Sequence, residues 1–171
     1  MAETVPTAFR IEPLGERHDR AHFSCGVDAL DRYLRAQAGQ DSRKHIASCF
    51  VLLTGNESVA GYYTLSAMGI ALVDLPAALA RKLPRYPVVP ATLIGRLAVD
   101  RRHQGQGFGE LLLFDAFSRT LRSEIASYAF VVDAKDNSAQ AFYEHYRFPQ
   151  LAGTGRRLFL PLAEIATLFS K

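Results

Sequence analysis

The chain has 171 residues, 49% of them hydrophobic and 22% charged, with a formal net charge of +3. This length and composition predict one globular domain over residues 1–171 and exclude a disordered or fibrous protein. No apolar stretch has the length of a membrane span and no secretory leader opens the chain, so we expect a cytoplasmic protein with no membrane partner. Cys25 and Cys49 lack metal-ligand spacing, and we expect two buried thiols and no bound metal.

The first half of the chain predicts a helix followed by a β-hairpin. Apolar residues recur at helical spacing from Asp28 to about Lys44, with Asp28 placed to cap the helix. Two apolar runs, 46–53 and 59–73, flank a polar turn and read as the two strands of a long hairpin. Pro76 can open a short helix over 77–83, and the proline-rich stretch 84–90 is expected to be an extended connection.

The second half alternates strands and helices. The pattern predicts a strand over 92–99, a glycine-rich turn, an apolar-periodic helix, a buried strand over 128–134, a helix over 138–146 and a last strand over 157–162. The apolar tail 162–169 can pack either within a subunit or across a pair. Mixed α/β is therefore the predicted fold class.

The glycine-rich turn predicts a phosphate site. Gly105, Gly107 and Gly109 lie on the turn and the first helical residues, where glycine lets a ligand approach the backbone and several N–H groups converge at a helix N-terminus. No Lys-Ser/Thr pair follows the glycines, which excludes a Walker loop, and their spacing does not match the dinucleotide fingerprint. A tight strand-to-helix turn without a ligand is the alternative interpretation.

The segment Arg102-His-Gln-Gly-Gln-Gly107 resembles the signature of the GCN5-related N-acetyltransferases (GNAT), and Ala139-Gln-Ala-Phe-Tyr143 resembles the segment that carries their tyrosine. The resemblance implies an α/β GNAT fold, with a mixed, mostly antiparallel sheet whose central strands splay apart, and acetyl-CoA as co-substrate. It also implies Tyr143 as the catalytic residue near the cofactor sulfur. The residues that it implies for cofactor binding are Leu97, Ala98, Val99, Arg102, Gln104, Gly105, Gln106, Gly107, Phe108, Gly109, Asn137 and Tyr143.

Six further segments are similar to the GNAT-type toxins of bacterial toxin–antitoxin modules; they begin at Phe23, Leu30, Gly61, Leu83, Gly95 and Val132. This resemblance implies acetylation of the α-amino group of aminoacyl-tRNA, inhibition of translation, a ribbon-helix-helix antitoxin as partner and a homodimer. Two positions depart from the family. Asp136 stands where many members have asparagine and can simply cap a helix, and Arg147 stands where glycine is common, so a left-handed turn there would be mildly strained.

The chemistry agrees with this resemblance. A neutral tyrosine at position 143 can donate a proton to a leaving thiolate, and a backbone N–H near Val99 can polarise the acetyl carbonyl. The strand 95–99 offers no carboxylate or histidine as a general base. An α-amine titrates near pH ~8 and lysine near ~10.4, so an α-amine can do without a dedicated base.

Positive charge gathers near the turn, because residues 81–110 carry six basic and two acidic side chains. A solvated basic face is the plain interpretation, and an anionic ligand the functional one. For a tRNA substrate we expect phosphate contacts from Arg81, Lys82, Arg85 and Arg96. Two alternatives stay open: a GNAT enzyme that acetylates a small amine or a protein N-terminus, and a non-catalytic CoA-binding or DNA-binding regulatory partner.

Overall fold

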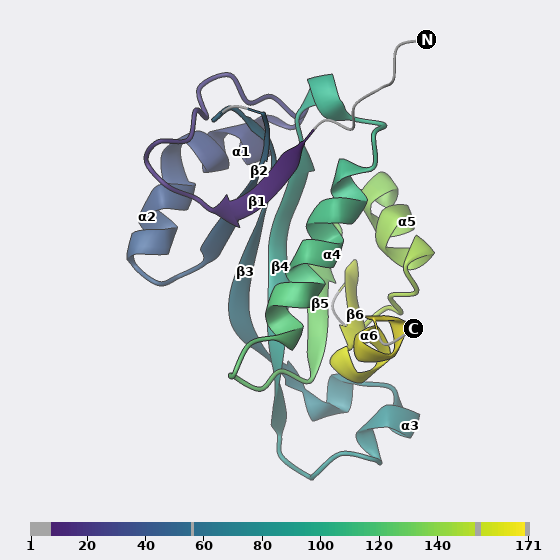
Figure 1. The fold of residues 1–171 in the computed structure, drawn as a ribbon. Helices are drawn as coiled ribbons and strands as arrows, with labels where there is room; N and C mark the ends of the chain where they lie inside the picture. The colour runs from purple at the N-terminus through teal and green to yellow at the C-terminus, as the bar shows by residue number, and fades with distance from the viewer. Residues whose placement is uncertain (1–7, 56, 153–154, 170–171) are drawn as a thin grey trace. The chain divides into compact units, whose positions relative to one another are not determined.

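The computed structural model describes residues 8–55, 57–152 and 155–169 (Figure 1). Within these residues the strands are β1 (Phe9–Pro13), β2 (Ser48–Thr54), β3 (Val59–Ala71), β4 (Val88–Val99), β5 (Ala129–Asp133) and β6 (Arg157–Pro161). The α-helices are α1 (Asp28–Arg32), α2 (Ala38–Arg43), α3 (Ala77–Ala80), α4 (Phe108–Leu121), α5 (Asn137–His145) and α6 (Leu162–Phe169). A π-helical segment, η1 (Tyr33–Gln37), and two 3₁₀ turns, η2 (Leu72–Asp74) and η3 (Arg101–His103), complete the elements of the described residues.

The sheet of the described residues has the order β1-β2-β3-β4-β5-β6. Pairing is antiparallel between β1 and β2, β2 and β3, and β5 and β6, and parallel between β4 and β5. The mixed α/β class and the mostly antiparallel sheet predicted from the sequence are confirmed. No helix among the described residues is both long and apolar enough to cross a membrane.

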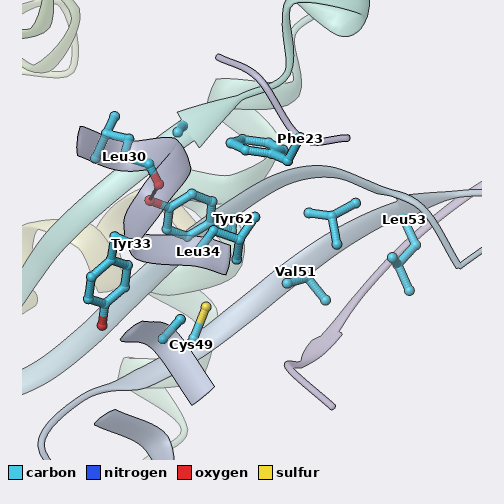
Figure 2. Close-up of a cluster of buried hydrophobic side chains, with 11 residues drawn as sticks. Phe23, Leu30, Tyr33, Leu34, Cys49, Val51, Leu53 and Tyr62 are labelled. Atoms are coloured by element: carbon cyan, nitrogen blue, oxygen red, sulfur yellow. Dashed lines mark hydrogen bonds between the residues drawn. The ribbon is translucent and has the colours of Figure 1, made fainter. Parts of the chain in front are cut away.

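The chain divides into two compact units, of which the first comprises Met1–Leu65 and Arg96–Ala116. Its core is an aromatic and aliphatic cluster in which Tyr62 is central (Figure 2): the Phe23 ring meets Tyr62 edge-on, and the Tyr33 ring stacks on it at 6.3 Å. The Tyr62 hydroxyl donates a 2.7 Å hydrogen bond to the Leu30 carbonyl, so its one polar atom is satisfied inside the cluster.

The helix predicted over 28–44 is present, but it is not a uniform α-helix. The amide of Ala38 donates to the carbonyl of Tyr33, five residues earlier, which defines the π-helical turn. The expected cap is wrong in detail: Val27 occupies the N-cap position, and Asp28 is the first helical residue. Asp28 instead lies 3.6 Å from Arg32, one turn along the same helix.

The second unit comprises Ser66–Gly95 and Phe117–Lys171. Its β4–β5 register runs from Ala91 opposite Ala129 to Ile94 opposite Val132. Residues 129–132 are all buried, as their continuous apolar run predicts for a strand covered on both faces. The unit's core also takes in Ile70, Leu75 and Phe159.

Two elements escaped the sequence analysis. Strand β1 pairs with β2 from Phe9 opposite Thr54 to Pro13 opposite Phe50, but Phe-Arg-Ile-Glu-Pro is too short and too charged to stand out as a strand. The tail 162–169 forms helix α6, which lies against β5 and β6 of its own unit. Of the two cysteines expected to be buried, Cys49 is, and Cys25 is partly exposed.

Candidate functional site

The glycine-rich turn joins β4 to α4 with an open backbone. Gly105 and Gly107 have φ angles of +80° and +82°, and a Cβ placed on either would meet no atom within 4 Å. Along the described chain, the backbone N–H groups from Gln104 to Gly109 donate to no protein acceptor. Backbone N–H groups without a protein acceptor, two positive φ angles and the start of a 14-residue helix together make this turn suited to bind a phosphate group.

A buried carboxylate holds this turn in shape. The Asp100 side chain is only 2% exposed and accepts hydrogen bonds from the backbone N–H of Arg102 at 2.9 Å and of Ser24 at 3.1 Å. The Arg102 guanidinium also binds it, through Nε at 2.9 Å and Nη2 at 3.3 Å. Burial opposes ionisation of Asp100, but these hydrogen bonds to Arg102 and Ser24 lower its pKa overall. The side chain of Arg102 therefore orders the turn from within.

A second connection ties the turn to the chain before α1. The Gln104 side-chain amide donates to the carbonyls of Cys25 and Val99, both at 3.0 Å, and the Arg101 amide donates to the Ser24 carbonyl at 2.8 Å. The backbone of Gln104 is then left for a ligand while its side chain stays engaged. The Phe108 ring is buried, 5.7 Å from the His103 ring, so only its backbone can serve the turn.

The predicted cofactor strand is the C-terminal part of β4. Ala98 is buried in the core cluster of its unit, whereas Leu97 and Val99 are half-buried. Arg96 shares the face of β4 that carries Ala98, because side chains alternate along a strand. Its guanidinium lies 3.5 Å from the centre of the Tyr33 ring.

Tyr143 lies on α5, in the second unit, and is 7% exposed. Phe142 and Phe148 flank it with rings at 5.2 and 5.6 Å, and burial raises the pKa of its hydroxyl. Across the described residues the hydroxyl has no hydrogen-bond partner, and it is not among the fully buried polar atoms that lack one, so the oxygen itself keeps some exposed surface. A neutral, desolvated tyrosine with an unused O–H is suited to donate a proton to a forming thiolate.

The two departures from the family pattern have local explanations. Asp136 caps α5, accepting from the Ala139 amide at 2.8 Å, as the sequence suggested, and Asn137 is the exposed first residue of the helix. Arg147 has a φ of 68°, which confirms the predicted left-handed turn with a non-glycine residue.

The basic residues fall into two places. Arg81, Lys82 and Arg85 are exposed on the segment after α3, next to Tyr86, whose side chain is 65% exposed. Arg96 belongs to the first unit and lines a cavity there. Sequence reasoning missed the role of Asp100, although an acidic residue directly before a basic turn was a usable signal, and it missed the cavity beside Tyr33.

Glu12, His18 and Glu57 bring their ligand atoms within 4.8 Å of one another, as a metal site would. Their ligand atoms already have hydrogen-bond partners within the protein. His18 accepts from the Gly15 amide at Nδ1, so its Nε2 carries the proton and donates to Glu12 at 2.7 Å. Arg10 and Arg17 bind the two carboxylates, and the hydrogen bond from His18 is the main reason why the pKa of Glu12 is lowered. This group is an ion-pair network that ties β1 to the β2–β3 turn.

Several known proteins are similar to this chain. The family model described as "Acetyltransferase (GNAT) domain" matches residues 89–157. The probable toxin TacT of Sinorhizobium fredii is 31% identical over 179 residues, covering 98% of this chain and 99% of TacT. A tRNA-acetylating toxin of Mycobacterium tuberculosis is 36% identical over 137 residues, covering 79% of this chain and 81% of that protein.

Two solved structures are similarly close. The toxin AtaT in complex with acetyl-methionyl-tRNAfMet superposes with a TM-score of 0.86 at 31% identity, covering 95% of this chain and 99% of AtaT. A mutant of AtaT bound to acetyl-CoA and to the C-terminus of the antitoxin AtaR gives 0.78 at 28% identity, with the same coverage of 95% and 99%.

Proposed function

This chain belongs to the GNAT acetyltransferases, close to the tRNA-acetylating toxins, and from that premise we propose that it acetylates the α-amino group of aminoacyl-tRNA and thereby inhibits translation. The observation that carries the proposal is the open turn from Gln104 to Gly109, fixed by Asp100, on a chain that aligns with a tRNA-acetylating toxin over 79% of its length. Residues 1–171 then act as a single acetyltransferase domain.

In this proposal the amides from Gln104 to Gly109 hold the pyrophosphate of acetyl-CoA. The pantetheine arm pairs with the backbone of Leu97–Val99, and Asn137 contacts the same arm. The positive φ angles of Gly105 and Gly107 support the first assignment, since left-handed residues in a turn are typical of the backbone nests that bind anions. Arg102 contributes to the turn through Asp100, which its Nε and Nη2 bind, and the remaining N–H donors of its exposed guanidinium can reach the phosphates.

The residues divide the chemistry as follows. The neutral α-amine of the acceptor attacks the thioester carbonyl, a backbone N–H near Val99 stabilises the developing oxyanion, and the amine releases a proton to water. Tyr143 donates its proton to the sulfur as the C–S bond breaks, and regains one from solvent. The buried hydroxyl supports this role, because burial keeps it protonated.

Arg81, Lys82, Arg85 and Arg96 are proposed to contact the phosphates of the tRNA. Exposed basic side chains beside an exposed aromatic ring, Tyr86, are typical of an RNA-binding surface. A ribbon-helix-helix antitoxin is the proposed protein partner, a homodimer the proposed assembly and the cytoplasm the proposed location. The complex of AtaT with AtaR supports an antitoxin.

Radiolabelled acetyl-CoA and charged total tRNA test the function directly. We expect label in the RNA fraction, released with the amino acid when the ester bond is hydrolysed at alkaline pH, and none with uncharged tRNA. Label in a small amine or in protein N-termini alone would favour the broader GNAT alternative. Growth inhibition that persists in a Tyr143→Phe variant would favour a non-catalytic partner.

A further inference from the structure

The π-helical turn at Tyr33–Gln37 borders a cavity of about 410 Å³ in the first unit. A π-turn adds one residue to a helical turn, is rare in proteins and is frequently found at functional sites. Its lining includes Leu30, Arg32, Tyr33, Ala36, Gln37 and Arg96.

The Arg96 guanidinium packs on the Tyr33 ring in the wall of this cavity. It covers the Tyr33 ring at 3.5 Å, an arrangement that uses the π-face and leaves the N–H donors pointing outward in the plane. Over residues 8–55, 57–152 and 155–169 these donors make no hydrogen bond and no salt bridge. A partly buried guanidinium with unused donors on a cavity wall is therefore set to bind a ligand oxygen.

The surface under Arg96 is itself fixed. The Tyr33 hydroxyl donates to Asp41 at 2.8 Å, and the Gln37 side-chain amide donates to the same carboxylate at 2.9 Å. Two residues of the π-turn thus share one acceptor on α2. Tyr33 also stacks on Tyr62 at one end of the core cluster (Figure 2), so the ring that supports Arg96 cannot turn freely.

The charge of the lining indicates the ligand. Arg32 and Arg96 contribute positive charge to the lining. The carboxylates near them, Asp28 and Asp41, lie outside the lining and are already bound, Asp28 by Arg32 and Asp41 by Tyr33 and Gln37. The lining therefore disfavours an ammonium group such as a polyamine or a lysine side chain. Leu30 and Ala36 add apolar surface. A phosphate next to a flat, largely apolar base matches this combination, because guanidinium forks pair with phosphate and bases pack on such walls.

We infer that this cavity receives the 3′-terminal nucleotide of the acceptor RNA, and that the edge of Arg96 binds the phosphate linking it to the preceding nucleotide. The inference rests on the proposed function. Arg96 directly precedes Leu97–Val99 on β4, so a nucleotide held there lies beside the strand assigned to the cofactor. Arg96 thus has a different role from Arg81, Lys82 and Arg85, which would contact the phosphates of the tRNA stem.

The test uses Arg96→Met, which keeps an apolar stem and a sulfur over the Tyr33 ring, and Arg43→Met as control, an exposed arginine of α2 outside the lining. The kcat/KM for charged tRNA should fall about 10- to 100-fold in Arg96→Met and stay within about twofold in Arg43→Met. The thermal midpoint and the Kd for acetyl-CoA should match wild type in both, which guards against misfolding.

Competition identifies the phosphate. The uncharged dinucleotide cytidylyl-adenosine should inhibit the wild type at least tenfold more strongly than adenosine, and Arg96→Met should lose that advantage. Any of three results overturns the inference. The dinucleotide and adenosine inhibit the wild type equally, the dinucleotide remains the stronger inhibitor of Arg96→Met, or Arg96→Met and Arg43→Met have equal kcat/KM for charged tRNA. A wild type that leaves charged tRNA unlabelled overturns the proposed function instead. In that case the Kd of the dinucleotide for the wild type and for Arg96→Met still tests the ligand of the cavity.

Discussion

The Tyr143 hydroxyl is the atom on which the proposed proton transfer depends. Removing it in Tyr143→Phe keeps the ring and its contacts with Phe142 and Phe148, so the fold should be unaffected. We expect kcat to fall about 100-fold with KM within about twofold, as for loss of a general acid. Tyr146→Phe, on the same aromatic cluster, is the control and should keep most of the activity.

The same residue makes a prediction about pH. Burial raises the pKa of the Tyr143 hydroxyl, so the hydroxyl stays protonated beyond pH ~10, the ordinary pKa of tyrosine. The α-amine of the acceptor loses its proton near pH ~8. The kcat/KM of the wild type should therefore rise through pH ~8 and then stay level to pH ~10. A bell-shaped profile that descends below pH ~10 would contradict the assignment of Tyr143 as the acid.

Asp100 is the second residue with a measurable signature. Its pKa is lowered, so its carboxylate stabilises the fold above the usual pKa near 3.8, and this contribution is lost as pH falls through the lower folded value. We expect Asp100→Asn to cost about 2 kcal/mol in unfolding free energy at pH 7, a difference that shrinks below pH ~4. Denaturant unfolding at several pH values measures it. Asp133→Asn, which removes an exposed partner of Arg157, should cost under about 1 kcal/mol.

At the scale of the element, the turn before α4 joins conformation to binding. Gly107→Ala adds a Cβ at a φ of +82°, which strains the backbone by about 1 kcal/mol and fills the open side of the cradle. We expect the Kd for acetyl-CoA to rise at least about tenfold by calorimetry, since the amides can no longer converge on the pyrophosphate. Gly55→Ala, at a φ of +76° in open space, should lose similar stability and keep the wild-type Kd.

At the scale of the whole molecule, a net charge of +3 conceals an excess of basic residues around the turn and the segment after α3. Reversing Lys82 and Arg85 to Glu should lower kcat/KM for charged tRNA at least about tenfold and flatten its dependence on salt, because phosphate contacts release counterions. The Kd for acetyl-CoA should not change. The same reversal at Arg43 and Lys44 is the control with equal net charge; equal effects of both pairs would mean that bulk charge alone is responsible.

The amino-acid sequence alone determined the features that rest on local patterns. Glycine spacing located the open turn, and apolar patterns predicted the β2–β3 hairpin and α4. The left-handed turn at Arg147 was predicted from the family resemblance, in which glycine is common at that position. Motifs spread along the chain were enough to indicate the family. Each of these features depends on residues close together in sequence, whose conformational preferences are strong enough to be seen one segment at a time.

Only the tertiary structure decided which side chains meet. Asp100 binds Ser24, 76 residues earlier, and Arg96 lies over Tyr33 from a different element; neither pairing leaves a trace in local periodicity. Strand β1 forms because β2 supplies its hydrogen bonds and Glu57 an ion pair with Arg10, not because its own residues favour a strand. The π-turn likewise depends on tertiary contacts, the packing of Tyr33 on Tyr62 and the hydrogen bonds that Tyr33 and Gln37 donate to Asp41. Long-range contacts of this kind depend on the folded backbone, which is why the sequence marked Arg96 as a basic candidate but could not reveal the cavity that it lines.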